Sequence, residues 1–118
     1  MPVRSLNSSV LTWPDRQVIE HALQQWVETH IVHRPDVLRV GYFGSYARGD
    51  WGVGSDLDLV ILLTDTEQPM TRRARNWDTL SLPVPTDVLV YTTDEWQTLH
   101  QRHARIVQQP ICWIYRKH

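Results

Sequence analysis

At 118 residues the chain has the size of one domain, and its formal net charge of −1 gives no bulk attraction for nucleic acid or an anionic membrane. Hydrophobic residues make up 42% and charged residues 21%, which is typical of a folded globular protein and argues against disorder. The single cysteine, Cys112, excludes an intrachain disulfide, and its apolar neighbours favour a buried structural thiol. No apolar run approaches the ~20 residues of a membrane helix, and the N-terminus lacks an apolar signal core. We therefore expect one cytoplasmic domain over residues 1–118.

The first predicted element is an amphipathic helix over residues 14–31. Thr12 and Asp15 resemble a capping box, and Pro14 suits the first helical turn. Apolar residues then recur at three- and four-residue spacing, which predicts one buried helix face. A strand over residues 37–43 follows.

The middle of the chain combines turns with apolar segments. Residues 44–55 are rich in glycine and other turn residues. Residues 57–63 are nearly all apolar with two aspartates at the entrance, which predicts a central strand buried on both faces. Residues 66–80 are interpreted as a helix with weak apolar periodicity, and a proline-containing break separates them from a short strand over residues 87–91.

The last third of the chain predicts a helix and an edge strand. Thr92 and Glu95 form a capping box that opens a helix reaching about Gln108. Pro110 ends that helix, and residues 111–115 complete the order as an edge strand. This order of helices and strands predicts an α/β or α+β domain built on a mixed sheet.

Two aspartates stand where the central strand begins. Asp56 and Asp58 are two residues apart, so their side chains point to the same side of the strand. Two such close carboxylates repel each other and resist burial unless a cation neutralises them. Magnesium prefers carboxylate and phosphate oxygens, so the pair predicts a Mg2+ site beside a phosphate.

The Gly44-Ser45 turn is the candidate phosphate site. Glycine lets the backbone approach a polyphosphate closely, and the following amide and serine hydroxyl can donate hydrogen bonds to it. A short helix beginning near Ser45 would add its N-terminal amides. Arg48 either contacts phosphate or braces the loop through an ion pair; the sequence leaves both open.

The segment from Gly44 to Leu59 resembles a known signature: Gly-Ser, ten residues, then Asp-x-Asp. It is similar to the DNA polymerase β-type nucleotidyltransferase superfamily. Ala47-Arg48-Gly49 and Ser55-Asp56 resemble its minimal nucleotidyltransferase branch. The resemblance implies that superfamily's fold, a short mixed sheet with helices packed mainly on one face. It also implies nucleotide contacts through Gly44, Ser45, Arg48 and Ser55.

The resemblance further implies a third carboxylate on a neighbouring strand. Asp87 fits best because it opens an apolar strand, and Asp65, Asp78 and Asp94 are the competitors. The implied reaction transfers AMP from ATP to a hydroxyl acceptor. Two Mg2+ ions would be held by the three catalytic and metal-binding carboxylates: Asp56, Asp58 and Asp87.

Minimal nucleotidyltransferases are often encoded beside a helical HEPN-type toxin. The resemblance therefore implies a toxin partner whose tyrosine is adenylylated, which would make this chain the antitoxin of a toxin-antitoxin pair. Larger relatives carry an additional acceptor-binding helical domain, so the acceptor surface here would come from a partner or a second copy. An antibiotic-modifying subunit and a non-catalytic binding antitoxin are the two alternatives.

Two groups of polar residues are interpreted as surface. Arg72, Arg73 and Arg75 favour a solvated helix face over contact with a triphosphate or an acidic partner. His100 and His103 share a helix face but lack convincing zinc-ligand spacing.

Six tryptophans are more than a core of this size readily hides. Trp26 lies on the apolar stripe of the first helix and is expected in the core. We expect at least one tryptophan to be exposed and to anchor a partner, and Trp51 and Trp77 are the leading candidates because neither lies on such a stripe.

Overall fold

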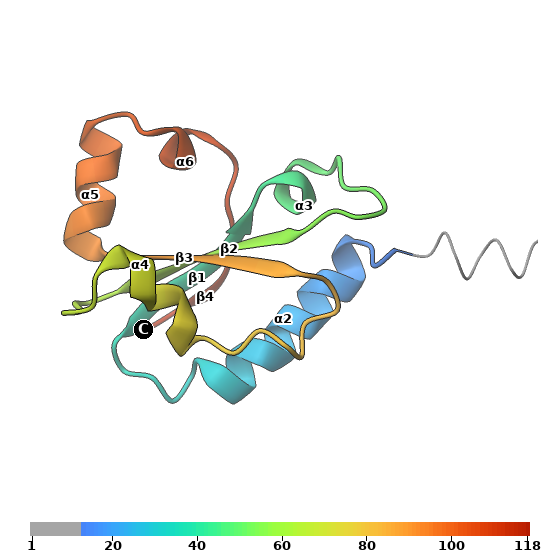
Figure 1. Ribbon diagram of the computed structural model, residues 1–118, viewed down its shortest axis with the longest axis horizontal. Coiled ribbons are helices and arrows are strands. Elements are labelled where there is room, and N and C mark those ends of the chain that lie inside the picture. Colours follow the sequence, from blue (N-terminus) through green and yellow to red (C-terminus); the bar gives the residue numbers. More distant parts are fainter. Residues whose placement is uncertain (1–12) are drawn as a thin grey trace, which may run out of the picture.

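The computed structural model describes residues 13–118 and has a four-stranded sheet with helices on both sides (Figure 1). The elements in chain order are α2 (Arg16–His30), β1 (Val37–Phe43), α3 (Ser45–Arg48), β2 (Leu57–Leu63), α4 (Met70–Arg73), the 3-10 helix η1 (Ala74–Asn76), β3 (Thr86–Thr92), α5 (Thr93–Gln101), α6 (Arg105–Gln108) and β4 (Cys112–Arg116). Within this part of the chain, no helix has the length and apolar character needed to cross a membrane.

The predicted first helix is confirmed as α2, with a different cap. The side chain of Asp15 accepts a hydrogen bond from the Val18 amide at 3.0 Å and so caps the helix alone. The expected capping box involved Thr12, which lies outside the described residues. The predicted apolar face is largely buried, through Ile19, Leu23, Trp26 and Val27, whereas Val18 is exposed.

The sheet is mixed, with strand order β3-β2-β1-β4. β1 pairs antiparallel with both β2 and β4, while β2 and β3 run parallel. Strand β2 is buried on both faces as predicted: Leu59 and Ile61 pack in the core cluster with α2, and Val60 and Leu62 pack with α5 and α6. Most of the core lies on the α2 side. The expected α+β fold with a mixed sheet is confirmed.

Two predicted helices are shorter than expected. Only α4 and η1 form within residues 66–80, because the remaining backbone turns to bury Trp77 in the core. The capping box of Thr92 and Glu95 is confirmed at the start of α5. That helix ends at Gln101 rather than near Gln108, and His103 adopts a positive φ of 53° before α6 begins.

Arg73 is the one member of the arginine run that is buried, which corrects the expectation of a wholly solvated face. Its guanidinium donates to both carboxylate oxygens of Glu95, at 2.6 and 3.0 Å. It also donates to the carbonyls of Gln68 and Val90, at 2.9 and 3.0 Å. The bonds from Arg73 lower the pKa of Glu95 to about 2. Arg73 thus ties α4 to β3 and to the start of α5.

Replacing Arg73 with methionine is expected to lower the free energy of unfolding by ~2 kcal/mol. Breaking a buried ion pair costs more than this, but Glu95 is 38% exposed, so solvent screens part of the loss. The exposed neighbour supplies the control: Arg72→Met should change stability by less than ~0.5 kcal/mol. Urea denaturation of both variants measures the difference.

The same ion pair makes stability depend on pH. Glu95 has a folded-state pKa below its unfolded value, so its stabilising contribution is present above about pH 4.3 and is lost as the pH falls towards 2. Wild-type protein should therefore lose more stability between pH 5 and pH 2 than Arg73→Met does. Equal losses in the two proteins would show that the pair contributes nothing.

Candidate active site

Asp58 and Asp87 lie side by side on neighbouring strands. They are register partners in the parallel β2–β3 pair, so their side chains project from the same face of the sheet. Asp56 precedes Asp58 by two residues at the entrance to β2. Asp58 is half-buried, and Asp56 and Asp87 are exposed. The structure thus brings together two of the predicted carboxylates directly and leaves the third next to them.

Asp58 is the carboxylate whose pKa is perturbed by its surroundings. Burial raises the pKa of Asp58, repulsion from Asp87 and then Asp56 raises it further, and Arg48 opposes these effects. Among residues 13–118, no basic side chain forms an ion pair with any of the three. Within the described part of the chain, the cluster therefore has no direct ion-pair partner for its negative charge.

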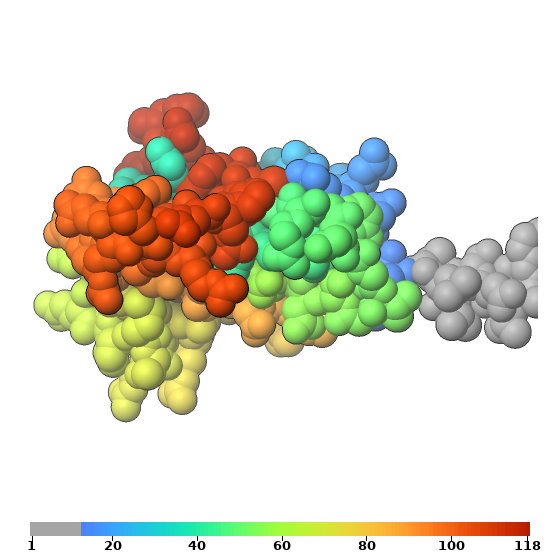
Figure 2. Space-filling model, turned by 90° about the horizontal axis from the view of Figure 1, so that it is seen from above, coloured from blue at the N-terminus to red at the C-terminus, as the bar shows by residue number. Residues whose placement is uncertain are grey.

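A cavity of about 530 Å³ opens beside this pair. Its lining consists of Phe43, Asp58, Ala74, Trp77, Thr79, Thr86, Asp87, Val88 and Leu89. In Figure 2 the light-orange segment containing β3 reaches the surface between the yellow-green α4 segment and the green loop after α3. Among the described residues, the two aspartates are the only charged ones in the lining, and most of the remaining wall is apolar. The cavity therefore presents two carboxylates, which can accept hydrogen bonds or bind a cation, beside a partly apolar wall.

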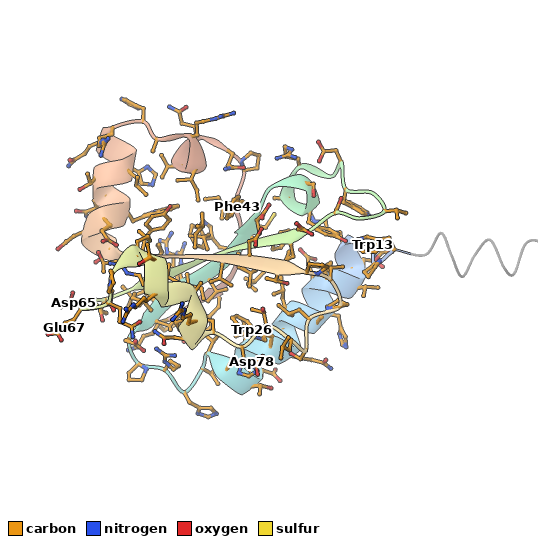
Figure 3. All side chains as sticks on the ribbon, viewed as in Figure 1. Trp13, Trp26, Phe43, Asp65, Glu67 and Asp78 are labelled. Carbon is orange, nitrogen blue, oxygen red and sulfur yellow. The ribbon has the colours of Figure 1, made fainter. Side chains whose placement is uncertain are left out.

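The competing third carboxylates lie elsewhere. Figure 3 shows Asp65 at the end of the sheet away from Phe43, and Asp78 beside Trp26 on the α2 side. The Asp78 carbonyl accepts a hydrogen bond from the Trp26 indole at 2.7 Å. Asp94 lies in the first turn of α5, away from the cavity. None of these three lies next to Asp58 on a neighbouring strand, as Asp87 does.

Gly44 joins β1 to α3 next to the carboxylates. Its φ of 75° and ψ of −151° are essentially restricted to glycine. A Cβ at this position would clash with Oδ2 of Asp58, so the backbone approaches that carboxylate more closely than any other residue would allow. Ser45 begins α3, as the sequence suggested, and no side chain of residues 13–118 caps the amides there.

Arg48 and Ser55 both make contacts within the loop after α3. Arg48 pairs with Asp50 at 3.2 Å, and both side chains are exposed. The Ser55 hydroxyl accepts a hydrogen bond from the Gly52 amide at 2.8 Å, which closes the turn. Its carbonyl accepts one from the Trp13 indole at 3.3 Å. These contacts brace the loop on the residues before α2.

The carboxylates fit a divalent cation by their chemistry. They are hard oxygen donors, no basic side chain among residues 13–118 forms an ion pair with them, and the missing Cβ at Gly44 leaves room for the Asp58 carboxylate itself. Within the described residues, no three acidic, histidine or cysteine side chains converge closely enough to hold an ion by themselves. Mg2+ usually takes one or two carboxylates and completes its shell with water and substrate phosphates, so a preformed three-ligand cage is not required.

Comparison with known proteins decides the family. The profile of the nucleotidyltransferase domain family matches residues 24–111, which include both strands that carry the aspartates. This chain belongs to that family. A search of curated proteins gives no match.

Two solved structures resemble this nucleotidyltransferase domain. One is a proposed nucleotidyltransferase from Sulfolobus solfataricus, with a TM-score of 0.65 and 18% identity over 86% of this chain and 84% of that one. The other is a toxin-antitoxin structure with AMP-PNP, with a TM-score of 0.49 and 19% identity over 83% of this chain and 73% of that one. At 18% identity, the first supports the shared fold.

Sequence reasoning missed most of the cavity wall of this nucleotidyltransferase domain. Phe43 is the register partner of Asp58 across β1 and β2, which only the strand pairing reveals. Trp77 was one of the two leading candidates for an exposed tryptophan, but it is 6% exposed, and the Arg34 guanidinium lies over it, 4.2 Å from the Trp77 ring centre. Trp51 is partly buried and stacks on Tyr46. Among these wall residues, only Phe43 could have been found from the motif itself, because it directly precedes Gly44-Ser45.

Gly44→Ala is expected to destabilise the domain by ~1–3 kcal/mol and to abolish transfer. The new methyl group would strain the backbone and displace the Asp58 carboxylate. Gly52→Ala is the matched control, because a Cβ there meets no atom of the described residues within 4 Å. Thermal unfolding and a nucleotidyl-transfer assay of the two variants distinguish them. Equal behaviour would show that the close approach at Gly44 is unimportant.

Proposed function

We propose that this nucleotidyltransferase domain transfers AMP from ATP to a hydroxyl group of a partner protein. The observation that carries the proposal is the in-register pairing of Asp58 with Asp87, beside Asp56 and the Gly44 turn. Asp56, Asp58 and Asp87 would hold Mg2+, with two ions as the resemblance implies. Bound Mg2+ would neutralise phosphate charge and make the α-phosphorus more electrophilic.

The protein groups have separate tasks in this reaction. The amides and hydroxyl at Gly44 and Ser45 position the β- and γ-phosphates, with Arg48 and Ser55 holding the following loop against the nucleotide. The acceptor oxygen bonds to the α-phosphorus, and the bond from that phosphorus to the oxygen bridging to the β-phosphate breaks. Pyrophosphate leaves, and Asp87 receives the hydroxyl proton.

The proposal also specifies the protein that accepts AMP. The minimal nucleotidyltransferase resemblance supports a tyrosine of a HEPN-type toxin as the acceptor, with this chain as the cytoplasmic antitoxin. The cavity is compatible with such a side chain, since its apolar wall leads to the Asp58–Asp87 pair. An antibiotic-modifying role would instead require a small free hydroxyl compound as the acceptor.

Incubation with each of the four ribonucleoside triphosphates tests the proposal. The protein encoded next to this gene and a panel of small hydroxyl compounds serve as acceptors, with Mg2+ or EDTA. Mass spectrometry should show AMP added to the neighbouring protein only with Mg2+ and ATP. Efficient transfer to a small compound without any protein acceptor would contradict the protein-acceptor assignment.

A further inference from the structure

Strand β3 is at the edge of the sheet, and two hydrogen bonds establish which of its backbone groups face outward. The Pro85 carbonyl accepts from the Leu57 amide of β2 at 2.9 Å, so it points into the sheet. The Val90 carbonyl accepts from Arg73 on the opposite side, at 3.0 Å. Backbone groups of successive strand residues point to opposite sides. The amides and carbonyls of Thr86, Val88 and Val90 therefore face outward.

This outer edge is closed at one end and open at the other. Arg73 occupies the Val90 carbonyl and ties α4 against that end of the strand. No residue of the described chain forms a hydrogen bond to the outward backbone groups of Thr86 or Val88. Both residues line the cavity that contains Asp87. The open edge thus flanks the proposed proton acceptor on both sides.

We propose that the open edge of β3 binds an extended segment of the acceptor protein, which adds a strand beside Thr86 and Val88. This inference rests on the proposed function and specifies how its acceptor binds. Alternating outward amides and carbonyls match the backbone of another polypeptide, the mode by which extended peptides extend a sheet. Asp58 and Asp87 are the only charged groups that residues 13–118 contribute to the cavity, so charge complementarity favours a segment that is neutral or basic around its hydroxyl.

The pairing also places the acceptor side chain. In paired strands, directly opposite residues project from the same face with Cβ atoms about 4.5–5.5 Å apart. Asp87 lies between Thr86 and Val88 and projects on the same face as Asp58. The segment residue opposite Asp87 would therefore present its side chain to both carboxylates. That residue is the one expected to carry the hydroxyl.

The test uses nine-residue peptides with a central tyrosine, serine or threonine, flanked by neutral, basic or acidic residues. Transfer from Mg-ATP is compared for Val88→Pro, which lacks the outward amide, and Val88→Ala, which keeps it. Proline is tolerated on an edge strand when its missing N–H faces outward. The KM for the peptide should be at least tenfold higher for Val88→Pro than for Val88→Ala, with equal Mg-ATP affinity. Peptides with acidic flanks should be the poorest acceptors.

Amide exchange of the wild-type chain provides a second measurement that requires neither turnover nor a substitution. The Val88 amide should exchange rapidly in the free protein and slow down at least tenfold when peptide binds. The Asp87 and Leu89 amides face β2, so they should already exchange slowly without peptide. This result is expected even if Val88→Pro fails to fold.

The outcomes separate this inference from the proposed function. Unchanged Val88 exchange at saturating peptide, or equal peptide KM for the two variants, overturns docking at the β3 edge. Modification of small hydroxyl compounds but of no peptide also overturns it and leaves nucleotidyl transfer intact. Failure of Mg-dependent ATP binding and of transfer to every acceptor overturns the proposed function itself.

Discussion

Replacing Asp58 with asparagine is expected to reduce nucleotidyl transfer at least a thousandfold, equivalent to ~4 kcal/mol in the activation barrier. Asparagine keeps the shape of the side chain but removes the charge that would hold Mg2+ beside the α-phosphate. Asp56→Asn combined with Asp58→Asn should abolish transfer. Steady-state assays with saturating ATP measure the loss.

The single substitution Asp58→Asn should leave the metal-free protein as stable as wild type or more stable. Burial and repulsion from Asp87 raise the pKa of Asp58, so its charged form opposes folding. Wild-type stability in EDTA should therefore rise as the pH falls through the folded-state pKa of Asp58, and Asp58→Asn should lack that rise. Asp65→Asn, at the far end of the sheet, is the control (Figure 3). A large drop in melting temperature for Asp58→Asn alone would mean that the aspartate is structural.

Replacing Asp87 with alanine should lower turnover by about two to four orders of magnitude, the usual contribution of a positioned proton acceptor. Binding of Mg-ATP should weaken only a few-fold, because Asp56 and Asp58 remain to hold the nucleotide-bound metal. Isothermal titration of ATP in the presence of Mg2+ measures the binding, and single-turnover transfer measures the chemistry.

Asp78→Ala and Asp94→Ala are the controls for Asp87 and should keep near-normal turnover. Asp78 lies beside Trp26 and Asp94 lies in the first turn of α5, both outside the cavity that contains Asp58. Near-normal activity in Asp87→Ala would assign the third role to another carboxylate. Asp65 would then be the next residue to replace.

The elements defined by strong local patterns were predictable from the sequence. The apolar run of β2, the capping box of Thr92 and Glu95, and the α3 start at Ser45 all follow from short-range physical rules, and all are present. The Asp-x-Asp pair was also recognisable from the sequence, because two close aspartates at the entrance to a buried strand are unfavourable unless a cation neutralises them. The sequence was sufficient to predict an element wherever interactions between residues within about four positions of each other determine its structure.

The features of the fold and site that the sequence did not predict depend on contacts between residues far apart in the chain. Arg73 belongs to a basic run that suggests a solvated face, yet Glu95, 22 residues later, buries it. Trp77 has no helical or strand periodicity, but it packs beneath Arg34, which no local pattern connects to it. The open edge of β3 likewise follows from strand order, which the sequence alone left undetermined.

We propose that the Asp58–Asp87 pair serves the transfer of AMP, which carries the α-phosphate of ATP. The most direct measurement compares ATP labelled at the α-phosphate with ATP labelled at the γ-phosphate, using the neighbouring protein and the hydroxyl peptides as acceptors. If the pair has this role, only the α-label becomes covalently attached to an acceptor, pyrophosphate is released in equal amount, and Asp58→Asn eliminates both. Transfer of the γ-label, or α-label transfer that persists in Asp58→Asn, would contradict it.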